Sequence, residues 1–182
     1  MAKGELAIVL HAHLPYVRSE VPGSLEEDWF FQALMECYLP LLQTLEEAAA
    51  SKEQRPRITI GLSPTLLTLL QDEDLKKRFP DWLTLRIALL NDAPQSQIEA
   101  ATHLSKTIKR QLNQWGNCCG DLIARFAELQ NSKVVDLLTC AATHGYLPLL
   151  REKPEAINGQ LKTAVTEHHR LFEKPNLFPS NR

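Results

Sequence analysis

Three short apolar runs, separated by long stretches with helical periodicity, constrain the fold of this chain most. The runs cover residues 6–10, 57–62 and 134–140, and each is rich in branched side chains. Short, bounded runs of this kind are typical of buried strands in parallel sheets. Strands that alternate with helices predict an α/β fold with a parallel sheet. Three strands leave two unpaired edges, so the sequence also predicts a sheet that this chain does not finish.

The segments between the runs carry helix signals. A helix is predicted from about residue 27 to 50, kinked or divided at Pro40, because proline lacks an amide hydrogen. Ser63 and Pro64 predict the next helix start, as N-cap and first helical residue. Helical patterns continue to about residue 90 with a break near Pro80 and resume over 95–115. Gly116, Asn117 and Gly120 then interrupt the pattern, and a further helix is predicted to run to 130. Pro154 begins the last predicted helix.

Histidines follow the first and third runs where each gives way to a proline-marked turn. His11 and His13 stand in His-Ala-His-Leu-Pro, and His144 stands in Thr-His-Gly-Tyr-Leu-Pro. His11 and His13 share a face of an extended strand with Ala7 and Val9, which we expect to point inward. Ligands of α/β proteins gather at the carboxyl ends of the strands. The sequence therefore predicts that the three histidines meet at one site.

Three interpretations of this site remain open. The histidines are satisfied polar residues at strand ends, or ligands of a metal ion, or hydrogen-bonding groups that recognise a polar substrate. A metal site would use His11, His13 and His144, but no carboxylate stands at any predicted strand end to join them. Tyr16 and Trp29 are candidates for stacking on a sugar ring, although either alone is more often a core residue.

Composition excludes several function classes. The 182 residues carry a formal net charge of -2 with interspersed signs, which gives no electrostatic reason to bind nucleic acid or an anionic membrane. The 44% hydrophobic content suffices for a core, yet no stretch approaches the roughly 20 apolar residues of a membrane span. The N-terminus has no signal-peptide pattern. The four cysteines lack metal-site or redox-motif spacing, so we expect reduced thiols in a cytoplasmic protein.

Taken together, these segments resemble glycoside hydrolase family 57, in particular its α-1,4-glucan branching enzyme-like members. The resemblance covers residues 6–150 and rests on several motifs in the expected order. They are Val9-Leu-His-Ala-His-Leu-Pro-Tyr-Val-Arg18, Asp28-Trp29 with Glu36-Cys-Tyr-Leu-Pro-Leu41, Gly61-Leu-Ser-Pro-Thr65, and Thr139-Cys-Ala-Ala-Thr-His-Gly-Tyr-Leu-Pro148. Other members tend to carry His-Gln-Pro in the first motif, so the His-Ala-His-Leu-Pro form favours the branching-type subgroup.

The resemblance implies a fold, a substrate and a set of binding residues. The family fold is an incomplete (β/α)7 barrel, of which residues 1–173 would form the N-terminal part. The family reaction is retaining, with a glutamate nucleophile and an aspartate acid/base, and a branching enzyme passes an α-glucan chain to a 6-hydroxyl group. By resemblance, His11, His13, Trp29 and His144 line the donor site, and we add Tyr16 as a substrate-binding candidate. No cofactor and no metal are implied.

The end of the chain departs from the family pattern. The family nucleophile lies in a Trp-Leu-Pro-Glu-type motif after the helix that here is expected to end near Phe172, whereas this chain continues as Glu173-Lys-Pro-Asn-Leu-Phe-Pro-Ser-Asn-Arg182. We therefore expect an unstructured tail over 174–182, no catalytic residue within the chain, and no activity for the chain alone. A second polypeptide would then carry the rest of the barrel. The alternatives are a metal-dependent hydrolase with a His-x-His site, or a non-catalytic glucan-binding subunit.

Overall fold

The computed structural model describes Gly4 and residues 6–51 and 56–173, so the predicted tail over 174–182 lies outside the described residues. Its sheet has three parallel strands in the order β1 (Val9–Ala12), β2 (Ile58–Leu62) and β3 (Val135–Leu138). The predicted α/β class and the three parallel strands are confirmed. The first strand begins at Val9 instead of Leu6, which places His11 inside the strand.

The sheet has one buried face and one open face. Leu10, Ile60 and Leu137 stand in register across the three strands, and Ile60 and Leu137 belong to the buried core. On the opposite face Val9 is 65% exposed and Leu138 is 49% exposed. The expectation that Ala7 and Val9 point inward is therefore wrong, because the described helices pack against the other side of this edge strand. His11 lies on the same open face as Val9.

The first long helical segment is divided, as Pro40 predicts. Helix α1 (Leu25–Ala33) passes through a π-helical turn (Leu34–Tyr38) into α2 (Leu39–Ala50), and Pro40 occupies the first turn of α2. The amide of Leu39 reaches back to the Leu34 carbonyl, five residues earlier. The buried Gln111 side chain donates to the Met35 carbonyl of this turn. The π-helical turn thus accommodates Pro40, and the chain remains helical from α1 into α2.

The next helical break occurs at Asp72 and not at Pro80. Helix α3 (Pro64–Gln71) ends at Asp72, whose side chain accepts hydrogen bonds from the amides of Asp74 and Leu75 and so starts α4 (Glu73–Asn91). Pro80 lies inside α4. The prediction of a break near Pro80 is wrong because buried side chains on both sides of the proline, among them Phe79 and Leu83, hold the helix against the core.

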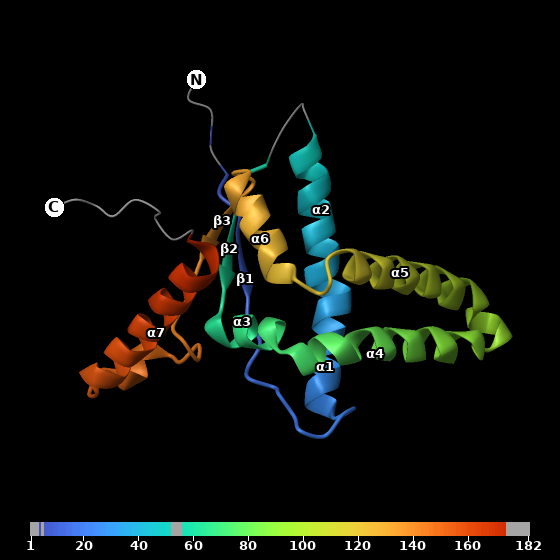
Figure 1. Ribbon diagram of the computed structural model, residues 1–182, viewed down its shortest axis with the longest axis horizontal. Coiled ribbons are helices and arrows are strands. Elements are labelled where there is room, and N and C mark those ends of the chain that lie inside the picture. Colours follow the sequence, from blue (N-terminus) through green and yellow to red (C-terminus); the bar gives the residue numbers. More distant parts are fainter. Residues whose placement is uncertain (1–3, 5, 52–55, 174–182) are drawn as a thin grey trace.

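Helix α4 and helix α5 (Ile98–Asn117) form a hairpin that extends away from the sheet (Figure 1). A short 3₁₀ turn (Gln95–Gln97) precedes α5. The chain reverses through Cys119 and Gly120, both with positive φ, before α6 (Leu122–Asn131). Gly120 is required there, because an added Cβ would lie 2.7 Å from Cζ2 of Trp115.

After β3 the chain makes a tight turn, a 3₁₀ segment (Leu147–Leu150) and helix α7 (Pro154–Phe172), which begins at the predicted proline. In Figure 1, α7 lies on the opposite side of the sheet from the α4–α5 hairpin. Helix α7 contacts α3 and α6, and its Phe172 is buried in the core. The rest of α7 is largely exposed, which leaves it accessible beside the strand ends.

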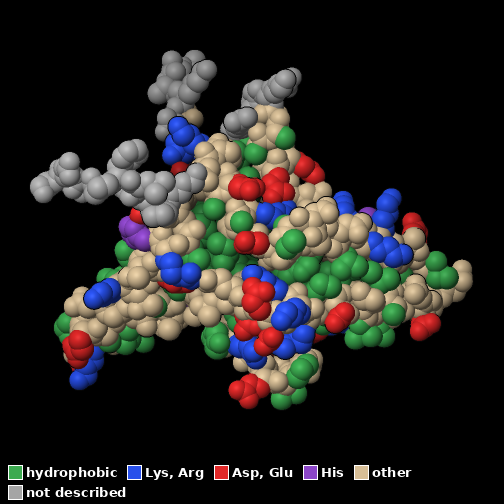
Figure 2. Space-filling view, in the orientation of Figure 1, with side chains coloured by type: hydrophobic (Ala, Val, Ile, Leu, Met, Phe, Trp, Pro, Cys, Tyr) green, Lys and Arg blue, Asp and Glu red, His purple; other side chains and the backbone are tan. Residues whose placement is uncertain are grey.

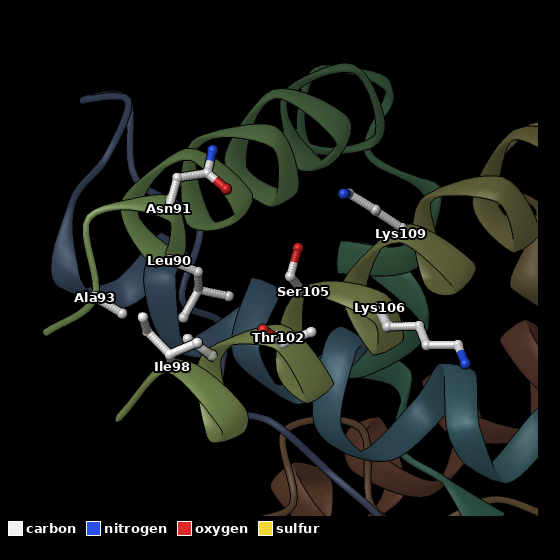
Figure 3. A pocket seen from close by; sticks show the side chains of 9 residues that line it. Leu90, Asn91, Ala93, Ile98, Thr102, Ser105, Lys106 and Lys109 are labelled. Atoms are coloured by element: carbon white, nitrogen blue, oxygen red, sulfur yellow. The ribbon is translucent and has the colours of Figure 1, made fainter. Parts of the chain in front are cut away.

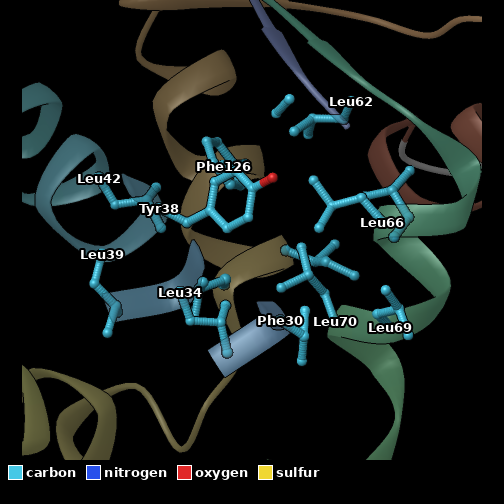
Figure 4. Packing of buried hydrophobic residues seen from close by; sticks show 14 of the residues in the cluster. Phe30, Leu34, Tyr38, Leu39, Leu42, Leu62, Leu66, Leu69, Leu70 and Phe126 are labelled. Carbon is cyan, nitrogen blue, oxygen red and sulfur yellow. The ribbon is translucent and has the colours of Figure 1, made fainter. Parts of the chain in front are cut away.

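One hydrophobic core unites the helices with the buried face of the sheet. Figure 4 shows Tyr38 and Phe126 between leucines from α2, β2 and α3. A salt bridge from Arg125 to Glu46, with Nε and Nη2 both 2.6 Å from the carboxylate, ties α6 to α2 at the edge of this core. The core is therefore apolar and contiguous.

Acidic and basic side chains intermingle on the face that Figure 2 shows. The four cysteines are free thiols, and the adjacent Cys118 and Cys119 do not pair. Within the described residues, no helix combines the length and the apolar character that crossing a membrane requires.

Candidate functional site

His11, His13 and His144 come together at the carboxyl ends of β1 and β3. The ring centroids of His11 and His144 are 4.7 Å apart, those of His13 and His144 are 4.1 Å apart, and those of His11 and His13 are 6.1 Å apart. His144 is more than 130 residues away from the other two in sequence. The prediction that the three histidines meet at one strand end is confirmed. We call these three residues the histidine cluster.

His11 stands on the open face of the sheet next to Gly61 of β2. The two residues are in register, and a Cβ added to Gly61 would lie 3.3 Å from Nδ1 of His11. Glycine therefore provides the space that the His11 ring occupies. Nε2 of His11 shares a hydrogen bond of 3.1 Å with Nε2 of His144. One imidazole donates and the other accepts when both are neutral.

His13 is anchored by the segment that follows β2. Its Nδ1 lies 2.9 Å from the hydroxyl of Ser63 and 3.4 Å from that of Thr65. Ser63 also caps α3, because its oxygen accepts from the amide of Leu66. Partial burial lowers the pKa of His13, and the neighbouring His144 and His11 lower it further. His13 is therefore a neutral imidazole at neutral pH.

His144 occupies a strained turn that α7 supports. Its φ is 56°, in the left-handed region that side chains other than glycine rarely adopt, and its amide donates to the Ala141 carbonyl at 2.8 Å. Gln160 of α7 accepts from the Thr143 amide and donates to the Thr143 hydroxyl, both at 2.9 Å. These contacts hold the turn in the conformation that directs His144 toward His11.

Cys140 adds a thiol to the edge of the histidine cluster. Its Sγ and one ring nitrogen each of His11 and His144 lie within 4.8 Å of one another. Burial raises the pKa of the Cys140 thiol, so the free side chain is protonated at neutral pH. Among the described residues, no aspartate or glutamate is hydrogen-bonded to the three histidines. The site as described offers three imidazoles, hydroxyl groups and one thiol.

The two predicted aromatic site residues are exposed. Tyr16, four residues beyond β1, is 60% exposed, and Trp29 in α1 is 50% exposed. Within the described part of the chain, no ring contact joins either one to the histidine cluster. Neither is a core residue, so both rings are accessible to a ligand.

One cavity lies away from the histidine cluster. It has a volume of about 470 Å³, lies between α4 and α5, and is lined by Leu90, Ile98, Thr102 and Ser105, among others (Figure 3). Its lining carries two lysines but no histidine, cysteine or carboxylate. The histidine cluster instead sits on an open strand end, where His11 and His144 are exposed.

The sequence did not reveal the residues that orient the histidine cluster, Ser63 and Gln160. The sequence pattern predicts only a capping role for Ser63, although this residue follows β2 directly and parallel strands end at the same edge. That edge rule could have placed Ser63 beside His13. No sequence signal identifies Gln160, because its contact to Thr143 depends on how α7 folds back.

A parallel α/β sheet with imidazoles gathered at its strand ends is typical of α/β proteins that bind a ligand at this edge. The comparisons with known proteins identify the family. Residues 7–177 match the profile of Glycosyl hydrolase family 57, so the chain belongs to this family. It is 34% identical over 173 residues to the 1,4-alpha-glucan branching enzyme of Thermococcus kodakarensis. It is 29% identical over 152 residues to a probable 1,4-alpha-glucan branching enzyme of Mycobacterium tuberculosis.

Solved structures agree with the sequence relatives. The GH57-type branching enzyme from Pyrococcus horikoshii superposes with a TM-score of 0.87 at 32% identity, over 94% of this chain and 33% of that chain. The alpha-amylase AmyC from Thermotoga maritima superposes with a TM-score of 0.85 at 29% identity, over 95% of this chain and 34% of that chain. The matches to the two sequence relatives cover 93% and 81% of this chain, which spans 25% and 27% of their lengths.

Proposed function

We propose that this chain supplies the histidine-lined part of the α-glucan donor site in a 1,4-α-glucan branching-type enzyme. The observation that carries the proposal is the convergence of His11, His13 and His144 at one strand end of a family 57 fold. The resemblance of the individual motifs to branching enzymes, and the names of the relatives, support an α-glucan as the substrate.

The geometry suits recognition of sugar hydroxyl groups. A neutral imidazole donates from one nitrogen and accepts at the other, which matches a hydroxyl group that does both. Partial burial, with the neighbouring His144 and His11, lowers the pKa of His13 and keeps it neutral, and Ser63 orients its ring. The exposed His11 and His144 are free to exchange their mutual hydrogen bond for hydrogen bonds to a ligand. The exposed rings of Trp29 and Tyr16 are the proposed stacking surfaces for glucose units.

Retaining glycosyl transfer needs two carboxyl groups about 5 Å apart across the scissile bond. The histidine cluster has none as a hydrogen-bonding neighbour among the described residues. We therefore propose that polypeptide other than these 182 residues provides both carboxylates, in an incomplete (β/α)7 barrel of which this sheet is one part. The open face of the sheet and its two edge strands are the surfaces that further strands would cover.

The first test measures binding of maltoheptaose to the 182-residue chain by isothermal titration calorimetry. We expect saturable binding that weakens at least about tenfold in His11→Ala and in His144→Ala, because each removes a hydrogen-bonding group from the site. His103→Ala, which changes an exposed histidine of α5, is the matched control and retains the affinity. Equal affinity in all four proteins would contradict the assignment of the site.

The second test is catalysis, followed by iodine staining and chain-length analysis of amylose. The 182-residue chain alone is expected to form no new 1,6-linkages and no reducing ends, because no carboxyl group among the described residues is hydrogen-bonded to the histidine cluster to act there as nucleophile. Mixing with a polypeptide that carries the remaining part of the Thermococcus kodakarensis enzyme is the complementation arm. Transfer by the chain alone, abolished by His144→Ala, would show that the chemistry lies within these residues.

The metal-dependent hydrolase with a His11, His13 and His144 site gains no support from the geometry. The group of donor atoms that lie within 4.8 Å of one another contains His11 and His144 but not His13, and within the described residues no carboxylate belongs to it. A purely glucan-binding role remains testable by the same two experiments, since it predicts binding without transfer in the complementation arm.

A further inference from the structure

Three potential metal ligands meet at the edge of the histidine cluster, and they differ from the set of His11, His13 and His144 that a metal site would use on the sequence alone. The donor atoms of His11, His144 and Cys140 all lie within 4.8 Å of one another. The Nε2 atoms of His11 and His144 are 3.1 Å apart. Zinc bonds nitrogen at about 2.0–2.1 Å and sulfur at about 2.3 Å, so ligand atoms around a tetrahedral ion are separated by roughly 3.3–3.7 Å. Small side-chain rotations therefore bring these donors into coordination distance.

The backbone already brings these donors together. His11 belongs to β1, whereas Cys140 and His144 flank the turn after β3, which the Gln160 side chain holds through Thr143. The positive φ of His144 directs its ring back toward the sheet. His13 does not belong to this group of donor atoms, and its Nδ1 instead lies against the hydroxyl groups of Ser63 and Thr65. The scaffold thus selects two imidazoles and one thiol.

The donor chemistry selects the kind of cation. Imidazole and thiolate ligands favour zinc and similar ions, whereas calcium and magnesium require oxygen ligands. Within the part of the chain that the structure describes, no carboxylate joins this set. Three protein ligands leave a coordination position open, and the exposure of His11 and His144 lets solvent or a ligand reach it. A set of three exposed or half-buried donors suits reversible binding more than a permanently held ion.

We propose that His11, Cys140 and His144 form a site for a thiophilic divalent cation of the Zn²⁺ class. The ion takes the imidazole nitrogens that the donor site needs, so it antagonises glucan binding. This second statement rests on the proposed function, whereas metal binding itself does not. Protein purified without added metal is expected to be empty, in agreement with the sequence-based expectation of no resident metal.

Cobalt is the probe for this site, because Co²⁺ substitutes for Zn²⁺ and reports a thiolate ligand through a sulfur-to-metal charge-transfer band. The 182-residue chain is expected to develop that band on titration with Co²⁺ and to lose it when Zn²⁺ is added. Cys140→Ser removes the band. His11→Ala or His144→Ala weakens Co²⁺ binding at least about tenfold, because even the loss of a residue that only orients a ligand typically costs about 10–100-fold in metal affinity.

The controls change two of the other cysteines and the third histidine of the histidine cluster. Cys37→Ser and Cys119→Ser change exposed cysteines away from the cluster, and His13→Ala tests the alternative donor set. All three are expected to keep the charge-transfer band. Absence of the band in the unchanged protein, or a band that survives in Cys140→Ser, would overturn the site.

A competition experiment separates this proposal from the proposed function. Saturating Zn²⁺ is expected to weaken maltoheptaose binding at least about tenfold in the unchanged chain, since the Nε2 atoms of two cluster histidines are taken. In Cys140→Ser, added Zn²⁺ has little effect on maltoheptaose affinity. A Cys140-dependent cobalt spectrum without any maltoheptaose binding would sustain the metal site and reject the glucan site. Independent binding of both ligands would reject the antagonism.

Discussion

The aromatic core around Phe79 of α4 and the histidine cluster at the strand ends are stabilised by different kinds of interaction. Phe79 is fully buried, with its ring centroid 5.5 Å from that of Phe31 and 4.6 Å from that of Trp115. The histidine cluster is exposed and depends on directional hydrogen bonds and on a left-handed residue. The aromatic core is stabilised by the volume that its rings fill, whereas the histidine cluster depends on the directions of its hydrogen bonds. Substitutions should therefore separate stability from ligand binding.

The largest expected effect on stability comes from the aromatic core. Phe79→Ala should lower the free energy of unfolding by about 3–5 kcal/mol, because it removes a buried ring and leaves a cavity. Urea denaturation followed by circular dichroism measures this loss. Leu149→Ala, at a side chain that is 80% exposed, is the control and should change stability by less than about 0.5 kcal/mol. Similar losses in both variants would mean that the core is misplaced.

Gly120→Ala should have the next largest effect. The substitution places a methyl group 2.7 Å from Trp115 and forces a side chain into a φ of 70°, so we expect a loss of about 2–3 kcal/mol. Gly159→Ala is the matched control, since Gly159 lies inside α7 with nothing within 4 Å of its Cβ position. It should raise stability by about 0.5–1 kcal/mol. Thermal melts that show the same sign for both variants would contradict this account.

Asp72 joins the start of α4 to Arg18, in the segment after β1, and adds a pH dependence. Burial raises the pKa of this carboxyl, but the amides of Leu75 and Asp74 and the Arg18 guanidinium together hold it below its ordinary value. Because the unfolded state then binds the proton more tightly, Asp72 stabilises the fold above its unfolded-state pKa and loses that contribution as pH falls through the folded one. Asp72→Ala should cost about 1–2 kcal/mol at pH 7.

Asp72→Asn isolates the charge, since asparagine is also a good N-cap. Denaturant titrations from pH 7 to pH 2 should show that the stability difference between the unchanged chain and Asp72→Asn shrinks as pH falls. A difference that stays constant over this range would exclude the ion pair with Arg18 as its source.

His144→Gly tests the cost of the site itself, with the smallest expected change in stability. Glycine relieves the positive φ of 56° but adds backbone freedom to the unfolded chain, so a net gain of about 0.5–1 kcal/mol is expected. The same variant should lose maltoheptaose affinity. Lys133→Gly, at a φ of 61°, should give a similar gain without any change in affinity. A destabilised His144→Gly would show that the His144 ring contributes more to folding than to binding.

The sequence predicted best where local chemistry decides the structure. Ser63 and Pro64 begin a helix because a hydroxyl cap and a proline satisfy its first turn, and β2 lies within one residue of its predicted range. The histidine cluster was also predictable, because parallel strands present their carboxyl ends at one edge.

Prediction failed where tertiary packing overrides local preference. Pro80 stays helical because the core holds α4 on both sides of it, and Val9 is exposed because no described element covers its face of the sheet. Two contacts orient the histidine cluster, Ser63 to His13 and Gln160 to Thr143. Each joins segments that are distant in sequence and meet only in the folded chain. No periodicity encodes such contacts.

The central claim is that three histidines act as one glucan-binding group, and their own NMR signals test it most directly. Ring Cε1–H resonances of the 182-residue chain, assigned through single His→Asn variants, are followed during titration with maltoheptaose. We predict that the signals of His11, His13 and His144 shift together and saturate with one dissociation constant, while those of His103 and His169 stay unchanged. Shifts confined to His103 and His169, or no shift in any of the three cluster histidines, would contradict the claim.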